Sequence, residues 1–177
     1  MERTRIKTRT LTGVALFTAI VVVLQLVGAA LYGPAAGAWL GLVFGLVVLL
    51  SGDAAAFLAV NPLGTVVTVL VKGAAAGFFA GWAYRLLADR HRYLAVIVAA
   101  IVCPVVNTGV FLLGCKLFFM ETINGWAGAM GFDNVGAYMI LGLVGANFLV
   151  EMGTDVILSP SVLRLIRIGE GSHSGLA

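Results

Sequence analysis

The stretch formed by residues 64–87 constrains the fold of this chain more than any other. It reads GTVVTVLVKGAAAGFFAGWAYRLL and is long enough to cross a bilayer, which takes about 20 helical residues. Lys72 lies well inside the apolar run, where a cation costs about 2.5–3.5 kcal/mol and normally faces a partner or a water-filled cavity. Gly73, Gly77 and Gly81 follow at four-residue spacing and predict a bare helix face that another helix can approach.

The composition excludes a soluble domain. The chain is 61% hydrophobic and 11% charged, whereas about a quarter of the residues of a soluble protein are charged. Its apolar runs are continuous, and apolar and polar residues do not alternate along them as they do in a β-barrel. The backbone N–H and C=O groups must therefore form their hydrogen bonds within helices when they lie in lipid. We therefore expect an all-α membrane protein with a single transmembrane domain over residues 1–177.

Breaks between the apolar runs predict a six-helix transmembrane bundle. The third helix is short, because Asn61-Pro62 ends it, and the second has a glycine ladder of its own at Gly37, Gly41 and Gly45. We expect Pro160 to bend or break the last helix, and the tail after residue 169 to be loose. The predicted helices span about residues 11–31, 35–50, 54–60, 64–87, 93–119 and 136–168.

Lysine and arginine give the orientation. They cluster in the N-terminal ten residues, at residues 85–92 and at Arg164 with Arg167. Short loops rich in these residues stay in the cytoplasm, so six crossings with both termini cytoplasmic place all three clusters on one side. The connections at residues 32–34, 61–63 and 121–135 are then predicted to lie outside.

A few polar residues fall at one depth of the outer half of the predicted bundle. Counting along each helix places Lys72, Asn107 and Asn147 at similar distances from its outer end. Glu151 follows Asn147 by four residues and shares its helix face, as Asp155 does one turn further on. A small polar solute entering from outside would meet these side chains, whereas the deeper Asp155 is expected to be structural.

Other readings of these residues remain open. Lys72 and Glu151 could pair only to hold two helices together, and Asn107 could form a hydrogen-bond clamp between helices. Trp126 and Phe132 lie in the long outer connection that could close as a lid, although aromatic residues also gather at membrane interfaces. Asn61, at the outer start of the stretch 64–87, completes the candidate substrate-binding set.

Motifs for catalysis, ATP hydrolysis and metal binding are missing from the sequence. Cys103 and Cys115 are twelve residues apart in one helical run, about 18 Å along its axis, so they cannot bridge and are expected in the core. The net charge of +3 comes from helix ends and does not indicate nucleic-acid binding. We expect no enzyme activity, no cofactor and no metal, and energy for uphill transport must come from another subunit.

The chain resembles the substrate-binding S component of energy-coupling factor (ECF) vitamin transporters. The resemblance covers about residues 9–168 and rests on size, six helices, basic cytoplasmic ends and the order of several segments. These are Ala15-xxx-Ala19, VLVKGAAAGFFAGWAYRLL, VVNTGVFLLG and NFLVE.

The resemblance implies a vitamin-capturing subunit in the bacterial cell membrane. Its partners would be a transmembrane coupling protein, which contacts Ala15 and Ala19, and two cytoplasmic ATPase subunits. Lys72 suits a carboxylate and the asparagines suit hydroxyl and amide groups, which favours pantothenate, with riboflavin and folate as alternatives. A self-sufficient small secondary carrier or channel, acting as a homo-oligomer, is the competing hypothesis.

Overall fold

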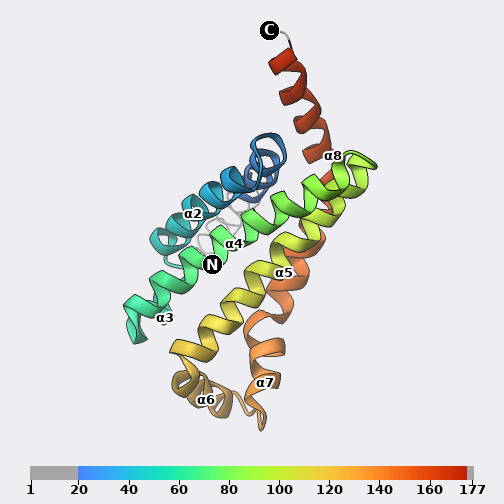
Figure 1. Cartoon of the computed structure of the whole chain (residues 1–177). Coiled ribbons are helices and arrows are strands. Elements are labelled where there is room, and N and C mark those ends of the chain that lie inside the picture. The colour runs from blue at the N-terminus through green and yellow to red at the C-terminus, as the bar shows by residue number, and fades with distance from the viewer. Residues whose placement is uncertain (1–19, 175–177) are drawn as a thin grey trace, which may run out of the picture.

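The computed structural model describes residues 20–174, apart from the side chains of residues 146–147 and 171–174. Every regular element in this range is a helix, as the composition predicts. Figure 1 shows α2, α4 and α5 side by side as long rods, with α6 and α7 gathered at one end. The elements are the helix Ile20–Tyr32, α2 (Pro34–Ser51), α3 (Ala55–Val60), α4 (Pro62–Ala88), α5 (Arg92–Phe118), α6 (Met120–Ala129), α7 (Val135–Ala137), the π-helix η1 (Tyr138–Gly145) and α8 (Ala146–Ser174).

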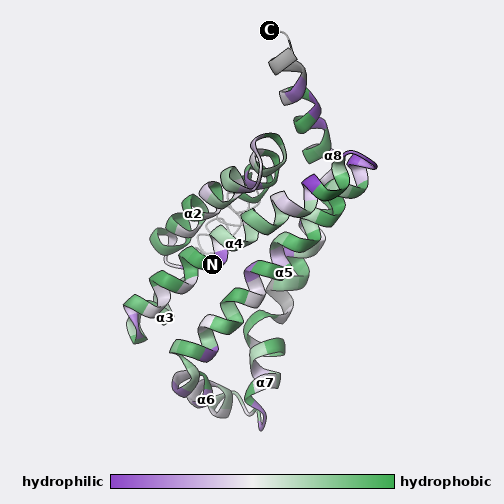
Figure 2. Cartoon of the chain, in the orientation of Figure 1, coloured by the Kyte–Doolittle hydropathy of each residue, from purple (hydrophilic) through white to green (hydrophobic). Residues whose placement is uncertain are grey.

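Three of these helices, α2, α4 and α5, are long and apolar enough to cross a membrane. The bent pair Val135–Gly145 and Phe148–Glu170 makes a fourth span if it is counted as one. Large apolar side chains such as Leu46, Val71 and Leu113 are exposed on the outside of the rods, and Figure 2 shows hydrophobic residues along their length. The protein is therefore an all-helical, multi-pass membrane protein.

Glycine brings α2 and α4 into backbone contact. A Cβ added at Gly41 would strike the carbonyl group of Gly73, and one added at Gly77 would strike that of Gly37. At the far end of the interface, a Cβ on Gly45 would lie 3.0 Å from the carbonyl oxygen of Val69. The two helices thus run antiparallel, and the prediction that both glycine ladders form packing faces is confirmed.

Gln25 fixes the helix Ile20–Tyr32 against this glycine interface. It is only 2% exposed, and its Nε2 donates a hydrogen bond of 3.2 Å to the carbonyl oxygen of Gly73. Around it lies the central core, which the helix Ile20–Tyr32, α4, α5 and α8 build together. Its buried members are Val22, Leu26, Ala76, Ala80, Tyr84, Ala95, Val96, Ala99, Ala100, Cys103, Val162 and Ile166.

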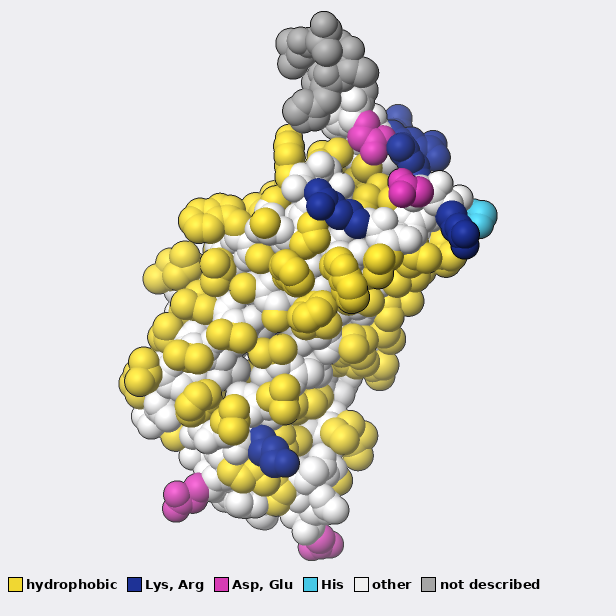
Figure 3. Space-filling model, in the orientation of Figure 1, with side chains coloured by type: hydrophobic (Ala, Val, Ile, Leu, Met, Phe, Trp, Pro, Cys, Tyr) yellow, Lys and Arg dark blue, Asp and Glu magenta, His cyan; other side chains and the backbone are white. Residues whose placement is uncertain are grey.

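The bundle has two chemically different ends. The Arg85 end comprises residues 32–34, residues 85–92 and the last turns of α8, where Arg92 forms a 2.6 Å ion pair with Glu170. The Asn61 end comprises the end of α2, α3, the start of α4, α6 and α7. Figure 3 shows most of the visible Lys and Arg side chains near the end of α8. This asymmetry favours a cytoplasmic Arg85 end.

Two parts of the predicted topology are wrong. Residues 32–34 are not opposite residues 85–92, because α2 starts beside the end of α4 and Arg85 Nη2 lies 3.5 Å from the carbonyl oxygen of Tyr32. The third predicted helix does not cross, because α3 has six residues and is about 9 Å long, against a hydrocarbon core of about 30 Å. The count of six crossings therefore fails at α3. The predicted cytoplasmic N-terminus lies outside the described residues.

The C-terminal third also differs from its prediction. The expected connection at residues 121–135 contains the helix α6, and the expected helix 136–168 begins as α7 and the π-helix η1. Beyond them α8 continues through Pro160 to Ser174, so the predicted break at Pro160 and the loose tail after residue 169 are not found over this range.

Candidate functional site

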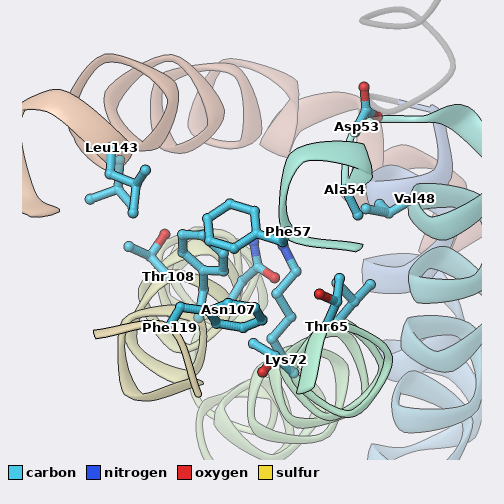
Figure 4. A pocket seen from close by; sticks show the side chains of 14 residues that line it. Val48, Asp53, Ala54, Phe57, Thr65, Lys72, Asn107, Thr108, Phe119 and Leu143 are labelled. Carbon is cyan, nitrogen blue, oxygen red and sulfur yellow. The ribbon is translucent and has the colours of Figure 1, made fainter. Parts of the chain in front are cut away.

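A cavity of about 190 Å³ lies among α3, the first half of α4, the second half of α5 and η1, toward the Asn61 end. Figure 4 shows the Lys72 side chain reaching up between Asn107 and Thr65 toward Phe57. The cavity is walled by apolar and aromatic side chains with a few polar groups among them, which is typical of small-molecule sites. The described residues that line it are Val48, Asp53, Ala54, Phe57, Thr65, Thr68, Val69, Lys72, Asn107, Thr108, Phe111, Phe119, Leu143 and Val144.

Lys72 presents a cation to this cavity. Its Nζ lies 5.1 Å from the centroid of the Phe111 ring, a distance at which the π face attracts the ammonium group. Within the described part of the chain it forms no ion pair. A cation–π contact is worth about 0.5–2 kcal/mol, which does not fully offset the cost of a cation at membrane depth. An anion bound in the cavity would supply the missing compensation.

Two polar atoms beside Lys72 have no hydrogen-bond partner within residues 20–174. They are Oγ1 of Thr68 and Oδ1 of Asn107, and both are buried. Leaving such an atom unsatisfied costs about 1–3 kcal/mol, so a ligand that bonds to it recovers free energy. Thr68 offers a hydroxyl donor or acceptor, and the Asn107 oxygen accepts from a hydroxyl or an amide N–H.

Glycine at position 114 makes room for Thr68. A Cβ at Gly114 would lie 2.9 Å from Cβ of Thr68, and even closer to the two tips of its side chain. Helices α4 and α5 can therefore approach each other at the cavity, and Thr68 stays on the side of α4 that carries Lys72, one turn away.

Phe57 joins the cavity to the Asn61-end cluster, whose buried members are Cys115, Phe119, Ile123, Ala127 and Tyr138. Its ring makes edge-to-face contacts with Phe111, Phe119 and Trp126, at centroid distances of 5.5, 5.0 and 5.4 Å. Phe57 itself lines the cavity, while Trp126 lies behind it in α6. Phe57, from the short helix α3, therefore lies in contact with both the cavity and α6.

The predicted site residues are only partly brought together. Lys72 and Asn107 line the same cavity, as expected from their depth. Trp126 contacts Phe57 and does not belong to the lining, and Phe132 packs on Tyr138 at 5.4 Å within the Asn61-end cluster. They stay predictions as ligand contacts. Trp126 supports the cavity wall through its contact with Phe57.

Asn61 serves the fold. Its Oδ1 accepts a 2.9 Å hydrogen bond from the backbone N–H of Gly64 and so caps the first turn of α4. Glu151 is half-buried on α8; it forms no ion pair in the described part of the chain and is not in the cavity lining. The clamp between Lys72 and Glu151 is therefore not formed. The side chain of Asn147, and Ala15 and Ala19, lie outside what the structure describes.

Sequence reasoning missed Thr68, Phe111 and Phe57. The first two are four residues from Lys72 and Asn107, so each shares a helix face with a residue already singled out, and this spacing could have identified them. Phe57 carries no such signal, because only the fold of α3 over α4 and α5 brings it to the cavity.

Among the described residues, no group of three His, Cys, Asp or Glu side chains is placed to hold a metal ion. What the site can do is hold a small molecule that has an anionic group and hydrogen-bonding groups close to it.

No family model matches the chain, and no curated protein or solved structure matches it either.

Proposed function

We propose that this chain is a membrane subunit that captures a small anionic solute in the outer half of the bilayer. One observation carries the proposal: Lys72 presents its ammonium group to a cavity without an ion-pair partner among the described residues, next to two unsatisfied oxygens. A charge kept at membrane depth in this way is by default a functional site.

The sidedness of the molecule supports capture from outside. Arg85, Arg92 and Arg167 belong to the Arg85 end, which the positive-inside rule places in the cytoplasm. The cavity lies toward the opposite, Asn61 end. A solute in the medium therefore has a shorter path to Lys72 than a solute in the cytoplasm.

The size of the cavity limits the solute. An engineered protein cavity of about 150 Å³ binds benzene, so about 190 Å³ encloses a group of roughly eight non-hydrogen atoms. The carboxylate, two methylenes and amide at one end of pantothenate form a group of this size. Riboflavin has no carboxylate for Lys72, and folate carries its carboxylates on a much larger molecule, so pantothenate remains the favoured candidate.

In this proposal the carboxylate of the solute binds Lys72, and its amide N–H donates to Oδ1 of Asn107. The chain has no ATP-binding motif, so other polypeptides would supply the energy. That division of labour is the one found in ECF transporters, and Ala15 and Ala19 remain the candidate contacts of the coupling protein. The setting would be a bacterial plasma membrane.

Binding of radiolabelled pantothenate to the detergent-purified chain, without ATP, tests the proposal. Lys72→Met keeps most of the length of the side chain and removes its charge. It should weaken binding about 10- to 100-fold, the equivalent of one charge-assisted hydrogen bond of about 1.5–3 kcal/mol. Lys116→Met is the matched control, because Lys116 is exposed and lies outside the cavity lining. Failure of wild-type protein to bind pantothenate would exclude this solute, and equal binding by both variants would exclude the site.

A further inference from the structure

A second buried charge lies on α8, outside the cavity at Lys72. Asp155 is only 3% exposed, and its Oδ2 forms no hydrogen bond. Among the described side chains, no basic group comes within ion-pair distance of it. Glu151 precedes it by one helical turn and is half-buried. An ionised carboxylate without a partner is very costly in such surroundings, so Asp155 needs a ligand that removes its charge.

A proton fits this position better than a metal ion. The described residues hold no cluster of three metal-ligating acids, histidines or cysteines. Asp155 also lines neither the cavity at Lys72 nor the polar cavity at the Arg85 end. A metal ion needs a cluster of ligating side chains and a cavity that holds it, whereas a proton needs neither.

Glu151 lies one helical turn before Asp155 on the same face of α8. Two carboxyl groups that lie close together disfavour a double negative charge, which also favours a proton on the buried Asp155.

We propose that Asp155 is a proton-binding site inside the membrane, because its carboxyl group is buried and its Oδ2 has no hydrogen-bond partner. This proton site does not rest on the proposed function.

Infrared spectroscopy of the purified protein tests the proton site without any solute. At neutral pH, wild-type protein should show the carbonyl band of a protonated carboxylic acid, and Asp155→Asn should remove it. The control Asp89→Asn changes an exposed residue of the Arg85 end and should remove carboxylate absorption only. Absence of the acid band from wild-type protein overturns the proposal, whether or not the variant folds.

Discussion

Replacement of Gly77 by alanine tests the contact between α2 and α4 that organises the bundle. The new Cβ would lie 2.5 Å from the carbonyl carbon of Gly37 and 2.5 Å from Nε2 of Gln25. Carbon atoms pack best at about 3.5–4.0 Å, so the two helices would have to separate by about 1 Å. Gln25 would then lose its hydrogen bond to Gly73.

The free energy of unfolding should fall by about 1–3 kcal/mol. Overpacking of this kind costs about 1–3 kcal/mol and loss of the Gln25 hydrogen bond about 1 kcal/mol. The higher helix propensity of alanine returns up to about 1 kcal/mol. The same substitution at Gly109 of α5 is the matched control, because a Cβ there meets no atom within 4 Å.

Thermal unfolding in detergent, followed by circular dichroism, measures the difference. A change of about 1 kcal/mol shifts the midpoint by about 2–4 °C for a chain of this length, so Gly77→Ala should unfold several degrees below wild type. Gly109→Ala should match or exceed wild type. Equal midpoints for the two variants would refute close packing of these two backbones.

Three further predictions follow from the cavity and its surroundings. Phe57→Ala removes the ring that three aromatic neighbours contact, so it should destabilise the protein by about 2–3 kcal/mol. The space left by the ring should let longer carboxylic acids compete with the bound solute, which a competition binding assay would measure. Asn61→Ala removes the cap of α4 and should lower the free energy of unfolding by about 1 kcal/mol. The control Asn124→Ala changes an exposed residue of α6 and should leave it unchanged. Wild-type stability of the Asn61 variant would contradict the capping role. The chain alone in liposomes should bind solute but not accumulate it when an ion gradient is imposed, and accumulation would favour the self-sufficient carrier.

The helical membrane fold and its close-packed faces could be predicted from the sequence. Continuous apolar runs leave a helix as the way to satisfy the backbone in lipid, and glycine at every fourth position leaves one side of a helix bare. Counting residues along α4 and α5 also placed Lys72 and Asn107 at one depth, because the rise of a helix is constant.

The order of crossings could not be predicted, because it depends on which ends meet in space. The apolar run 54–60 predicted a short third span, and the basic clusters agreed with that count, yet α3 has only six residues and ends at Asn61, where α4 begins. The sequence of α6 and of the π-helix η1 carries no local pattern that distinguishes them from the connection and the continuous helix predicted there. For the same reason Phe57 was missed, since its contacts with Phe111 and Phe119 join separate helices.

We expect Lys72 to hold an anionic solute in the cavity toward the Asn61 end. Mass spectrometry of the small molecules that co-purify with the protein tests it without choosing a solute in advance. Wild-type protein and Lys116→Met should release the same acid, and Lys72→Met should release at least about ten times less of it. Equal amounts from all three proteins, or a bound molecule without an acidic group, would contradict the claim.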